Sequence, residues 1–175
     1  MSTNVWKEFE ENQLSHSAAH YLMTIHALLD EFGYARVTDI AKQLNITRGS
    51  CSISLKPLKR RGLVVEDENR FLKLSDEGLR MAQLVARNDE LLEIFFRDVL
   101  GVEQEQAEID ACKIEHLLSI ESSIRLAAFI EHIQSGSDTT DAFLQTIRQD
   151  AVACEHDSKK CSLCDEVCFA EGQLE

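Results

Sequence analysis

The sequence lacks the features that mark membrane, secreted and repetitive proteins. No run of apolar residues approaches the roughly 18 that a membrane-spanning helix needs. The first residues, Met1 to Glu8, are too polar and acidic for a signal peptide. The chain also shows no internal repeat and no low-complexity tract. We therefore expect a soluble, cytoplasmic protein that does not bind membranes.

The motifs that mark common enzymes are missing as well. The sequence contains no Gly-rich phosphate-binding loop, no nucleophile motif and no acid–base pair in a recognisable frame. Its 175 residues with 44% hydrophobic content allow one packed domain or two small ones. The sequence predicts that the protein is not an enzyme. The alternative from another functional class is an enzyme or a metal carrier that acts through a metal site alone.

The distribution of charge is uneven, although the net charge is −13. Residues 1–85 hold 11 basic and 11 acidic side chains, whereas residues 86–175 hold 7 and 20. Attraction to phosphates depends on local charge, so the neutral N-terminal half can bind DNA. The acidic half is expected to face away from the duplex or to neutralise cations.

The N-terminal half has the pattern of a helix-turn-helix. An amphipathic helix over residues 15–29, stopped by Gly33, precedes a short helix over residues 37–44. A tight turn leads to Thr47, which caps a second helix that runs towards Arg61. Two short helices joined in this way predict a DNA-binding helix-turn-helix.

The remaining elements are a hairpin and further helices. Strand-like runs at 63–65 and 71–74 flank an acidic turn and predict a β-hairpin wing. Pro57, the only proline, lies inside the second helix of the motif and predicts a bend or an early end there. Ser75 is expected to cap the first of four later helices. These are predicted over residues 76–100, 103–118, 121–133 and 141–152. The fold class is therefore mainly α, with a winged helix-turn-helix in residues 1–75, helices in 76–152 and a cysteine-rich tail in 153–175.

Candidate DNA contacts fall into two groups. The start of the second helix carries hydroxyls and a guanidinium that can reach base edges or phosphates, and basic residues on later turns and the wing suit phosphates. The groups are Thr47, Arg48, Ser50 and Ser52, then Lys56, Lys59, Arg60, Arg61 and Arg70. A basic triplet by itself is more often a solvated helix end, and winged helices also serve as protein-interaction modules. The helix-turn-helix spacing together with the basic helix favours DNA binding.

Cys112, Glu115 and His116 form the sharpest local motif, Cys-Lys-Ile-Glu-His. On a helix their spacing of i, i+3 and i+4 places a thiolate, a carboxylate and an imidazole on one face. This mixed ligand set suits Fe²⁺, Co²⁺ or Zn²⁺ better than Mg²⁺ or Ca²⁺. Taken alone, such a triplet is more often a mixture of core and surface residues.

Several stretches together resemble one family, that of the diphtheria toxin repressor and manganese transport regulator. The stretches are residues 20–25 (HYLMTI), 33–41 (GYARVTDIA), 59–64 (KRRGLV), 74–78 (LSDEG), 89–93 (DELLE) and 112–119 (CKIEHLLS). The resemblance implies a winged helix-turn-helix followed by a helical metal-binding and dimerisation domain, here residues 76–152. It implies a short form without the C-terminal SH3-like domain. It also implies a homodimer that binds a palindromic DNA operator and represses genes of iron or manganese homeostasis.

The resemblance also implies ligands for a primary metal site. Cys112, Glu115 and His116 fall on the family's motif, and the N-terminal helix contributes a further ligand at the position of His20. Met23 stands where manganese regulators carry a carboxylate, and its soft thioether disfavours Mn²⁺. Because the cysteine resembles the iron-responsive branch, we expect Fe²⁺ to be favoured over Mn²⁺.

A second metal site is implied less completely. The family has histidine where Asp89 stands, keeps a glutamate at Glu93, and often has histidine where Glu108 stands. These three carboxylates could hold a cation through their oxygens. The alternative is that the site is lost and leaves three surface carboxylates.

Four of the six cysteines crowd into the tail, outside the resemblance. In a reducing compartment, metal or cluster binding outranks disulfide formation for Cys154, Cys161, Cys164 and Cys168. Four thiolates suit a tetrahedral Zn²⁺ ion or an iron–sulfur cluster, and the latter is slightly favoured because it would give the regulator a redox input. The tail could also be without a ligand. An alternative function follows, in which the tail is the only sensor and the divalent-metal site is degenerate.

Overall fold

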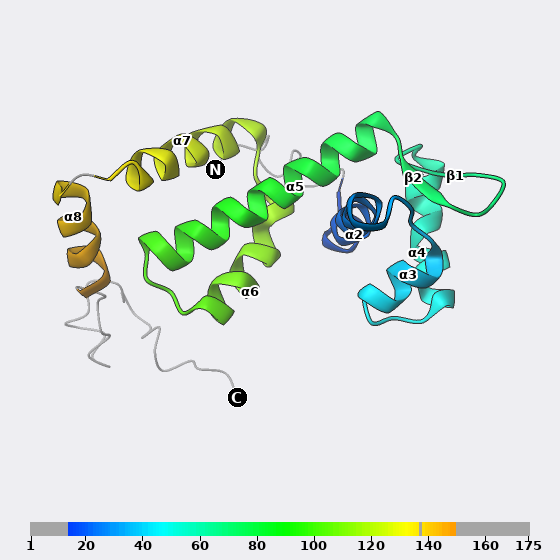
Figure 1. The fold of residues 1–175 in the computed structure, drawn as a ribbon, viewed down its shortest axis with the longest axis horizontal. Helices are drawn as coiled ribbons and strands as arrows, with labels where there is room; N and C mark the ends of the chain where they lie inside the picture. The colour runs from blue at the N-terminus through cyan, green and yellow to red at the C-terminus, as the bar shows by residue number, and fades with distance from the viewer. Residues whose placement is uncertain (1–13, 137, 150–175) are drawn as a thin grey trace, which may run out of the picture. The chain divides into compact units, whose positions relative to one another are not determined.

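The computed structural model describes residues 14–136 and 138–149, and most of them are helical (Figure 1). The chain divides into two compact units, residues 1–135 and 136–175. Helices α2 to α7 and both strands belong to the first unit, and α8 (Asp138–Gln149) belongs to the second. Within the part of the chain that is described, no helix is long and apolar enough to cross a membrane.

Helix α2 (His16–Phe32) begins and ends where local side-chain chemistry requires. The Ala18 amide donates to Ser15 Oγ at 3.3 Å, which satisfies one of the free N–H groups of the first turn. Gly33 ends the helix in the left-handed conformation with φ 75°, and its amide donates to the carbonyl of Leu29. Gly33 is the stop that the sequence predicts, and the helix extends up to it, three residues beyond the predicted Leu29.

Helices α3 (Val37–Gln43) and α4 (Arg48–Arg60) form the predicted helix-turn-helix. Asn45 turns the chain with φ 52°, and Thr47 Oγ1 then accepts from the Ser50 amide at 3.1 Å. Helix α4 continues through Pro57, so the predicted early end is wrong. The carbonyl that loses its partner belongs to Ile53, whose side chain is 65% exposed, so water can hydrate that turn.

Strands β1 (Val64–Glu66) and β2 (Leu72–Leu74) form the antiparallel wing, with Val64 opposite Leu74. The first strand starts one residue later than predicted, because the Leu63 amide donates to the carbonyl of Leu58 at the end of α4. The Leu72 amide donates to the Ala35 carbonyl at 2.8 Å, which ties the wing to the chain just before α3.

The core of the winged part extends into the next helix. Apolar side chains of α2, α3, α4 and the wing are fully buried together. Ala82 and Val85 of α5 (Asp76–Ile94) belong to the same cluster. Ser75 caps α5 as predicted, since its Oγ accepts from the Gly78 amide at 3.1 Å. Helix α5 therefore belongs partly to the winged core.

The C-terminal half of α5 packs against the later helices. A π-helical turn (Phe95–Val99) follows α5, and a 3₁₀ turn (Glu115–Leu117) follows α6 (Gln104–Ile114). Helix α7 (Ile120–Gln134) packs on α5, and Phe129 contacts Phe95. The predicted helices over 76–100 and 103–118 are thus present, but each ends in a turn of different pitch. Helix α8 starts three residues before the predicted residue 141.

Candidate metal centre and DNA-binding face

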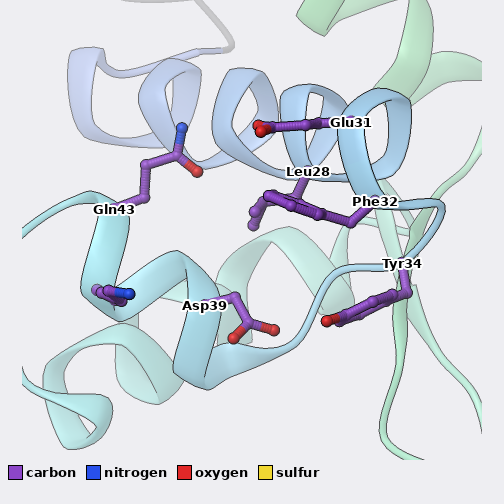
Figure 2. Close-up of a pocket in the computed structure, with 7 residues that line it drawn as sticks. Leu28, Glu31, Phe32, Tyr34, Asp39 and Gln43 are labelled. Carbon is purple, nitrogen blue, oxygen red and sulfur yellow. The ribbon is translucent and has the colours of Figure 1, made fainter.

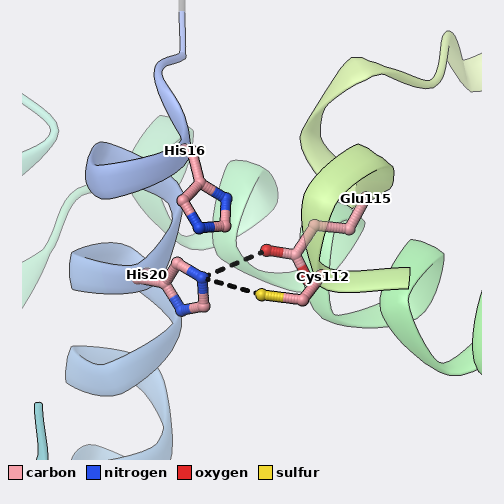
Figure 3. Close-up of side chains that lie close together, drawn as sticks. All are labelled: His16, His20, Cys112 and Glu115. Atoms are coloured by element: carbon pink, nitrogen blue, oxygen red, sulfur yellow. Dashed lines mark hydrogen bonds and ion pairs between the residues drawn. The ribbon is translucent and has the colours of Figure 1, made fainter. Parts of the chain in front are cut away.

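Four potential metal ligands meet between α2 and the end of α6 (Figure 3). His16 and His20 lie one turn apart on α2, Cys112 is in the last turn of α6, and Glu115 opens the 3₁₀ turn. One ligand atom from each of these residues lies within 4.8 Å of the others. His20 Nε2 is 3.2 Å from Cys112 Sγ and 3.8 Å from Glu115 Oε1.

Cys112, Glu115 and His116 were predicted on one face of a single α-helix, but the helix ends between Cys112 and Glu115 and a tighter 3₁₀ turn follows. Ile114, with φ −120° and ψ −7°, ends α6, and the chain continues into the 3₁₀ turn. This turn directs Glu115 inward, where its side chain is only 1% exposed. Asn88 Nδ2 donates to the Glu115 carbonyl at 2.8 Å and holds the turn against α5.

His116 lies beside the cluster. Its ring centroid is 5.3 Å from that of His16, and its buried Nδ1 makes no hydrogen bond within the described chain. Three of the four predicted ligands, His20, Cys112 and Glu115, therefore contribute to the cluster. His16 is the fourth residue of the cluster, in place of the predicted His116. Sequence reasoning missed His16, although its i, i+4 spacing from His20 was a usable signal.

Glu115 is the most strongly perturbed group of the cluster. Burial and the neighbouring carboxyl of Asp89 raise the pKa of Glu115 to about 8. Its Oε1 atom is buried and has no hydrogen-bond partner among the described residues. A bound divalent cation would compensate this carboxylate, so the residues present fit a metal site.

The pKa values of His20 and Cys112 are shifted towards the uncharged forms of these two ligands. Burial, and then the neighbouring His16, lower the pKa of His20, which favours the neutral imidazole that binds metal. Burial, and then Glu115, raise the pKa of the Cys112 thiol. Metal binding here must therefore release protons from the thiol and the carboxyl.

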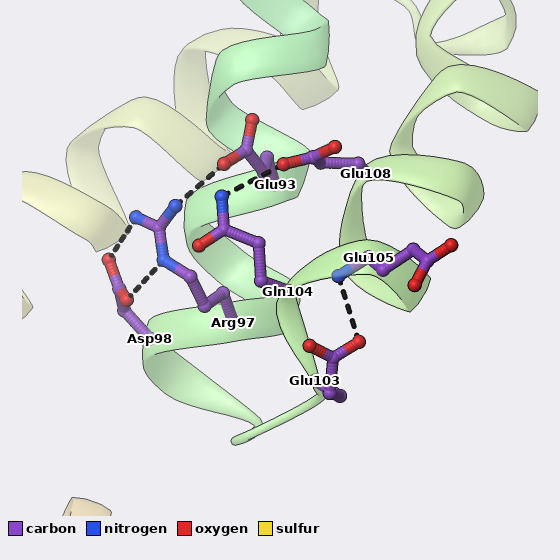
Figure 4. Close-up of polar contacts among 7 residues, drawn as sticks. All are labelled: Glu93, Arg97, Asp98, Glu103, Gln104, Glu105 and Glu108. Atoms are coloured by element: carbon purple, nitrogen blue, oxygen red, sulfur yellow. Dashed lines mark hydrogen bonds and ion pairs between the residues drawn. The ribbon is translucent and has the colours of Figure 1, made fainter.

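Asp89, predicted for the second site, lies against the first cluster. Burial raises its pKa, while a hydrogen bond with Glu115 and the charge of His20 oppose that rise. The predicted partners Glu93 and Glu108 make other contacts (Figure 4). Arg97 Nη1 donates to Glu93 Oε1 at 2.6 Å, and Gln104 Nε2 donates to Glu108 Oε1 at 2.8 Å. Within the described residues these three carboxylates do not form a cluster with ligand spacing, and an ion there stays a prediction.

The reading helix and the wing enclose one hollow of about 570 Å³. The predicted DNA-binding residues in its lining are Arg48, Ser52, Lys56, Lys59 and Arg70. Lys59 forms an ion pair with Glu66 of the wing, which joins α4 to β1. Sequence reasoning missed Arg36, which also lines the hollow and stacks over the Phe71 ring at 4.2 Å.

The other predicted DNA-binding residues lie around this hollow. Thr47 and Ser50 share a hydrogen bond of 2.9 Å between their hydroxyls at the start of α4. Arg60 and Arg61 are exposed at its end and are not part of the lining. The hollow thus presents four cationic side chains of the predicted set on one surface.

A separate hollow of about 390 Å³ lies at the C-terminal end of α2 (Figure 2). Its lining includes the aromatic side chains of Phe32 and Tyr34 and the carboxylates of Glu31 and Asp39. His16 and His20 lie at the opposite end of α2, so this hollow does not belong to the metal centre. None of the predicted site residues lines it.

The five cysteines outside the cluster are Cys51, in the winged part of the chain, and the four of the tail. Cys51 is fully buried in the winged core, and burial raises the pKa of its thiol. The predicted tail ligands Cys154, Cys161, Cys164 and Cys168 lie outside the described residues.

Two family models match this chain. Residues 13–72 match the N-terminal DNA-binding domain of iron-dependent repressors. Residues 75–143 match the metal-binding and dimerisation domain of the same repressors. The first covers the winged helix-turn-helix, and the second covers both elements that carry Cys112 and Glu115.

Individual relatives agree with these matches. The HTH-type transcriptional regulator MntR of Lysinibacillus sphaericus (strain C3-41) is 32% identical over 122 residues, which cover 70% of this chain and 87% of the relative. The crystal structure of T. acidophilum IdeR is 26% identical, with a TM-score of 0.55 over 65% of this chain and 53% of that one. A manganese-dependent transcriptional repressor in complex with manganese is 27% identical, with a TM-score of 0.53 over 65% of this chain and 52% of that one. The chain spans about half the length of these two solved structures.

Proposed function

This chain belongs to the diphtheria toxin repressor and manganese transport regulator family of metal-dependent repressors, and from that membership we propose that it is an Fe²⁺-responsive repressor. Members of the family bind DNA and dimerise through the C-terminal domain. The chain is accordingly a transcriptional regulator and not an enzyme. The single observation that carries the choice of site is the meeting of His20, Cys112 and Glu115 ligand atoms within 4.8 Å.

The ligand chemistry supports iron over manganese. A thiolate and imidazole nitrogen suit Fe²⁺, Co²⁺ and Zn²⁺, whereas Mn²⁺ is better served by carboxylate and carbonyl oxygens. Met23, at the position of a carboxylate in manganese regulators, is packed against the winged core. Manganese is the second candidate, because a manganese-bound repressor is among the similar solved structures.

A metal in this centre would connect the two halves of the first unit. His20 is on α2, whose Leu22 and Ile25 are fully buried in the winged core together with α4. Cys112 is on α6 and Glu115 is on the 3₁₀ turn that follows it, and both elements pack on α5. The ion would supply positive charge that holds these elements together, and we expect the reading helix to be oriented for DNA as a result.

The DNA contacts are proposed from the lining of the hollow between α4 and the wing. Arg48 and Ser52 lie on the first turns of α4 and would reach base edges or phosphates. Lys56 and Arg70 would contact phosphates and fix the register on a palindromic operator. Lys59 is assigned to holding the wing through Glu66.

A second input through the tail is proposed from the sequence motif alone. Cys154, Cys161, Cys164 and Cys168 would bind an iron–sulfur cluster, with Zn²⁺ as the alternative occupant. If the tail were the only sensor, loss of Glu115 would leave metal-dependent DNA binding unchanged.

The decisive test is DNA binding as a function of metal. Protein purified without oxygen would be used to select a palindromic duplex from a random library, and its affinity would be followed by fluorescence anisotropy. We expect Fe²⁺ to tighten binding at least about tenfold, a chelator to reverse this, and Mn²⁺ to act more weakly. C112A and E115A should lose the response while keeping the basal, metal-free affinity.

Three results would contradict parts of the proposal. Equal affinity with and without every metal would end metal-dependent repression. A stronger response to Mn²⁺ than to Fe²⁺ would select the manganese alternative. A response that survives E115A but disappears when the chain ends at Ala153 would make the tail the sensor.

The occupant of the tail needs its own measurement. Elemental analysis and a visible spectrum of the full chain would be compared with those of a chain that ends at Ala153. Iron and acid-labile sulfide that disappear with the tail are expected. A colourless protein whose zinc disappears with the tail would replace the cluster by a structural ion.

A further inference from the structure

We propose that His16 is a ligand of the metal centre, and that it completes a set of two imidazoles, one thiolate and one carboxylate. The inference rests on the proposed function, because it concerns the same centre. It assigns to His16 the place that Met23 would otherwise have taken on α2, and it makes His16 a determinant of which ion binds.

The local geometry places His16 in the cluster. His16 and His20 are one turn apart on α2, and their ring centroids are 4.4 Å apart with the rings nearly perpendicular. One ring nitrogen of His16 lies within 4.8 Å of a ligand atom of each of His20, Cys112 and Glu115. Figure 3 shows both imidazoles on the side of α2 that faces Cys112 and Glu115.

The first turn of α2 is fixed rather than frayed. Ser15 Oγ accepts from the Ala18 amide, and the Ala19 amide donates to the Ser15 carbonyl at 2.9 Å. Leu14, directly before this cap, is buried in the winged core. A histidine at position 16 is therefore presented from an anchored backbone.

Met23 is not available in the same way. It lies one turn beyond His20 and packs against the apolar cluster of the winged part. Moving its thioether to an ion would leave unfilled space in that core. His16 is exposed, so its ring can turn towards an ion at little cost in packing.

The ligand set changes the expected selectivity. Four protein ligands with nitrogen and sulfur donors are typical of tetrahedral Zn²⁺ sites, and Co²⁺ and Fe²⁺ accept similar ligands. Without His16, three protein ligands would remain and water would complete a larger coordination shell. His16 should therefore favour Zn²⁺, Co²⁺ and Fe²⁺ over Mn²⁺.

The test uses Co²⁺ as a spectroscopic probe. The full chain would carry serine in place of the four tail cysteines. Cys51 is fully buried in the winged core, so a thiolate band would then report on Cys112. Co²⁺ should give a thiolate charge-transfer band and the intense visible bands of a four-coordinate ion. H16A should keep the thiolate band, lose most of the visible intensity and bind Co²⁺ about 10-fold to 100-fold more weakly, while Mn²⁺ affinity changes less.

The matched control is H26A. His26 is also on α2, half-buried, and its Nδ1 lies 3.7 Å from Asp30 Oδ2, away from the cluster. H26A should leave the spectrum and both affinities unchanged. C112A should abolish the thiolate band and serves as the test of the centre itself.

The outcomes separate this inference from the proposed function. If H16A behaves like H26A while C112A abolishes the band, His16 is not a ligand but the centre stands. If H116A, and not H16A, changes the visible bands, His116 holds the position that we assign to His16. If C112A has no effect either, the proposed centre fails, and the inference fails with it.

Discussion

At the scale of single residues, Glu115 has surroundings that an ordinary carboxylate avoids. It is almost completely buried, Asp89 lies beside it, and its Oε1 has no hydrogen-bond partner within the described chain. Without a metal, the protein must either keep this group protonated or accept a buried charge next to another acid.

This arrangement predicts an unusual pH dependence for the metal-free protein. The pKa of Glu115 is about 8 when folded, against an ordinary value of 4.5. Between these values the folded state binds more protons than the unfolded state, so the free energy of unfolding falls as the pH rises. E115Q should remove this fall, and the advantage of the variant should grow by roughly 1–3 kcal/mol between pH 5 and pH 8.

Urea unfolding in the presence of a chelator, at several pH values, measures this effect. E131Q is the control, because Glu131 is exposed on α7 and is not near the cluster. Parallel stability curves for E115Q and the unmodified chain would show that Glu115 titrates normally in the folded protein.

Gly78 is constrained by a close approach of two backbones. A Cβ atom at this position would lie 2.2 Å from the carbonyl oxygen of Leu63, which also accepts the Ser75 amide. G78A should therefore push α5 away from the wing and lower the free energy of unfolding by about 1–3 kcal/mol. The measurement is chemical unfolding of the metal-free protein.

Gly49 provides the comparison for this substitution. Outside the backbone of its own helix, a Cβ atom there would meet nothing closer than Thr47 Oγ1 at 3.8 Å, and the residue is helical. G49A should be neutral or stabilise the protein by up to about 1 kcal/mol. Equal effects of G49A and G78A would contradict the close approach.

At the scale of helices and strands, the sequence was most informative where the determinants are local. The sequence predicts Thr47 and Ser75 as caps, and in the structure each of these side chains accepts from an amide three residues later. Gly33 was identifiable as a stop because the helix end needs a left-handed residue. These positions were enough to define the helix-turn-helix and the start of α5.

The turns that close α5 and α6 could not be predicted, because packing decides them. The 3₁₀ turn after Ile114 is held by Asn88, 27 residues earlier in the chain. It places Glu115 inside the cluster and turns His116 to its edge. Helical spacing treats Glu115 and His116 as equivalent ligands, and only the tertiary contacts distinguish them.

The reading helix leads to a prediction about DNA affinity. Lys56 lines the hollow between α4 and the wing, and we assign it to a phosphate. K56A should weaken binding to all duplexes by a similar factor and reduce the slope of log affinity against log salt by about 1. R48A should in addition reduce the preference for the selected palindrome, because Arg48 is assigned to base edges.

Anisotropy titrations at several salt concentrations, on the selected and on a scrambled duplex, check both effects. K113A removes the same charge from α6, where Lys113 pairs with Asp110, and should leave the slope unchanged. A loss of slope in K113A equal to that in K56A would mean that overall charge, rather than the hollow, controls affinity.

At the scale of the whole molecule, family membership assigns metal binding and dimerisation to the same C-terminal part. The matched family model for residues 75–143 is a metal-binding and dimerisation domain and includes α7. On this helix Ile130 is buried, whereas Ile120 and Ile124 are each 62% exposed and lie one turn apart. The apolar residues of α7 thus divide into a core set and a surface set, which the sequence alone did not separate.

The exposed pair on α7 predicts where the dimer is most sensitive. Burying an isoleucine side chain contributes about 1.5–3 kcal/mol, and a dimer with twofold symmetry buries each one twice. I124E should therefore raise the dimer dissociation constant by at least about 100-fold and leave the helical circular dichroism unchanged. I53E is the matched control, because Ile53 is 65% exposed on α4, in the DNA-reading helix. Sedimentation equilibrium should show monomer for I124E and dimer for I53E. Both variants should bind the palindrome weakly. I124E loses affinity because its two reading heads are no longer joined, and I53E loses affinity because phosphates repel the added carboxylate. A dimer that is equally stable in I124E would place the subunit contact on another surface.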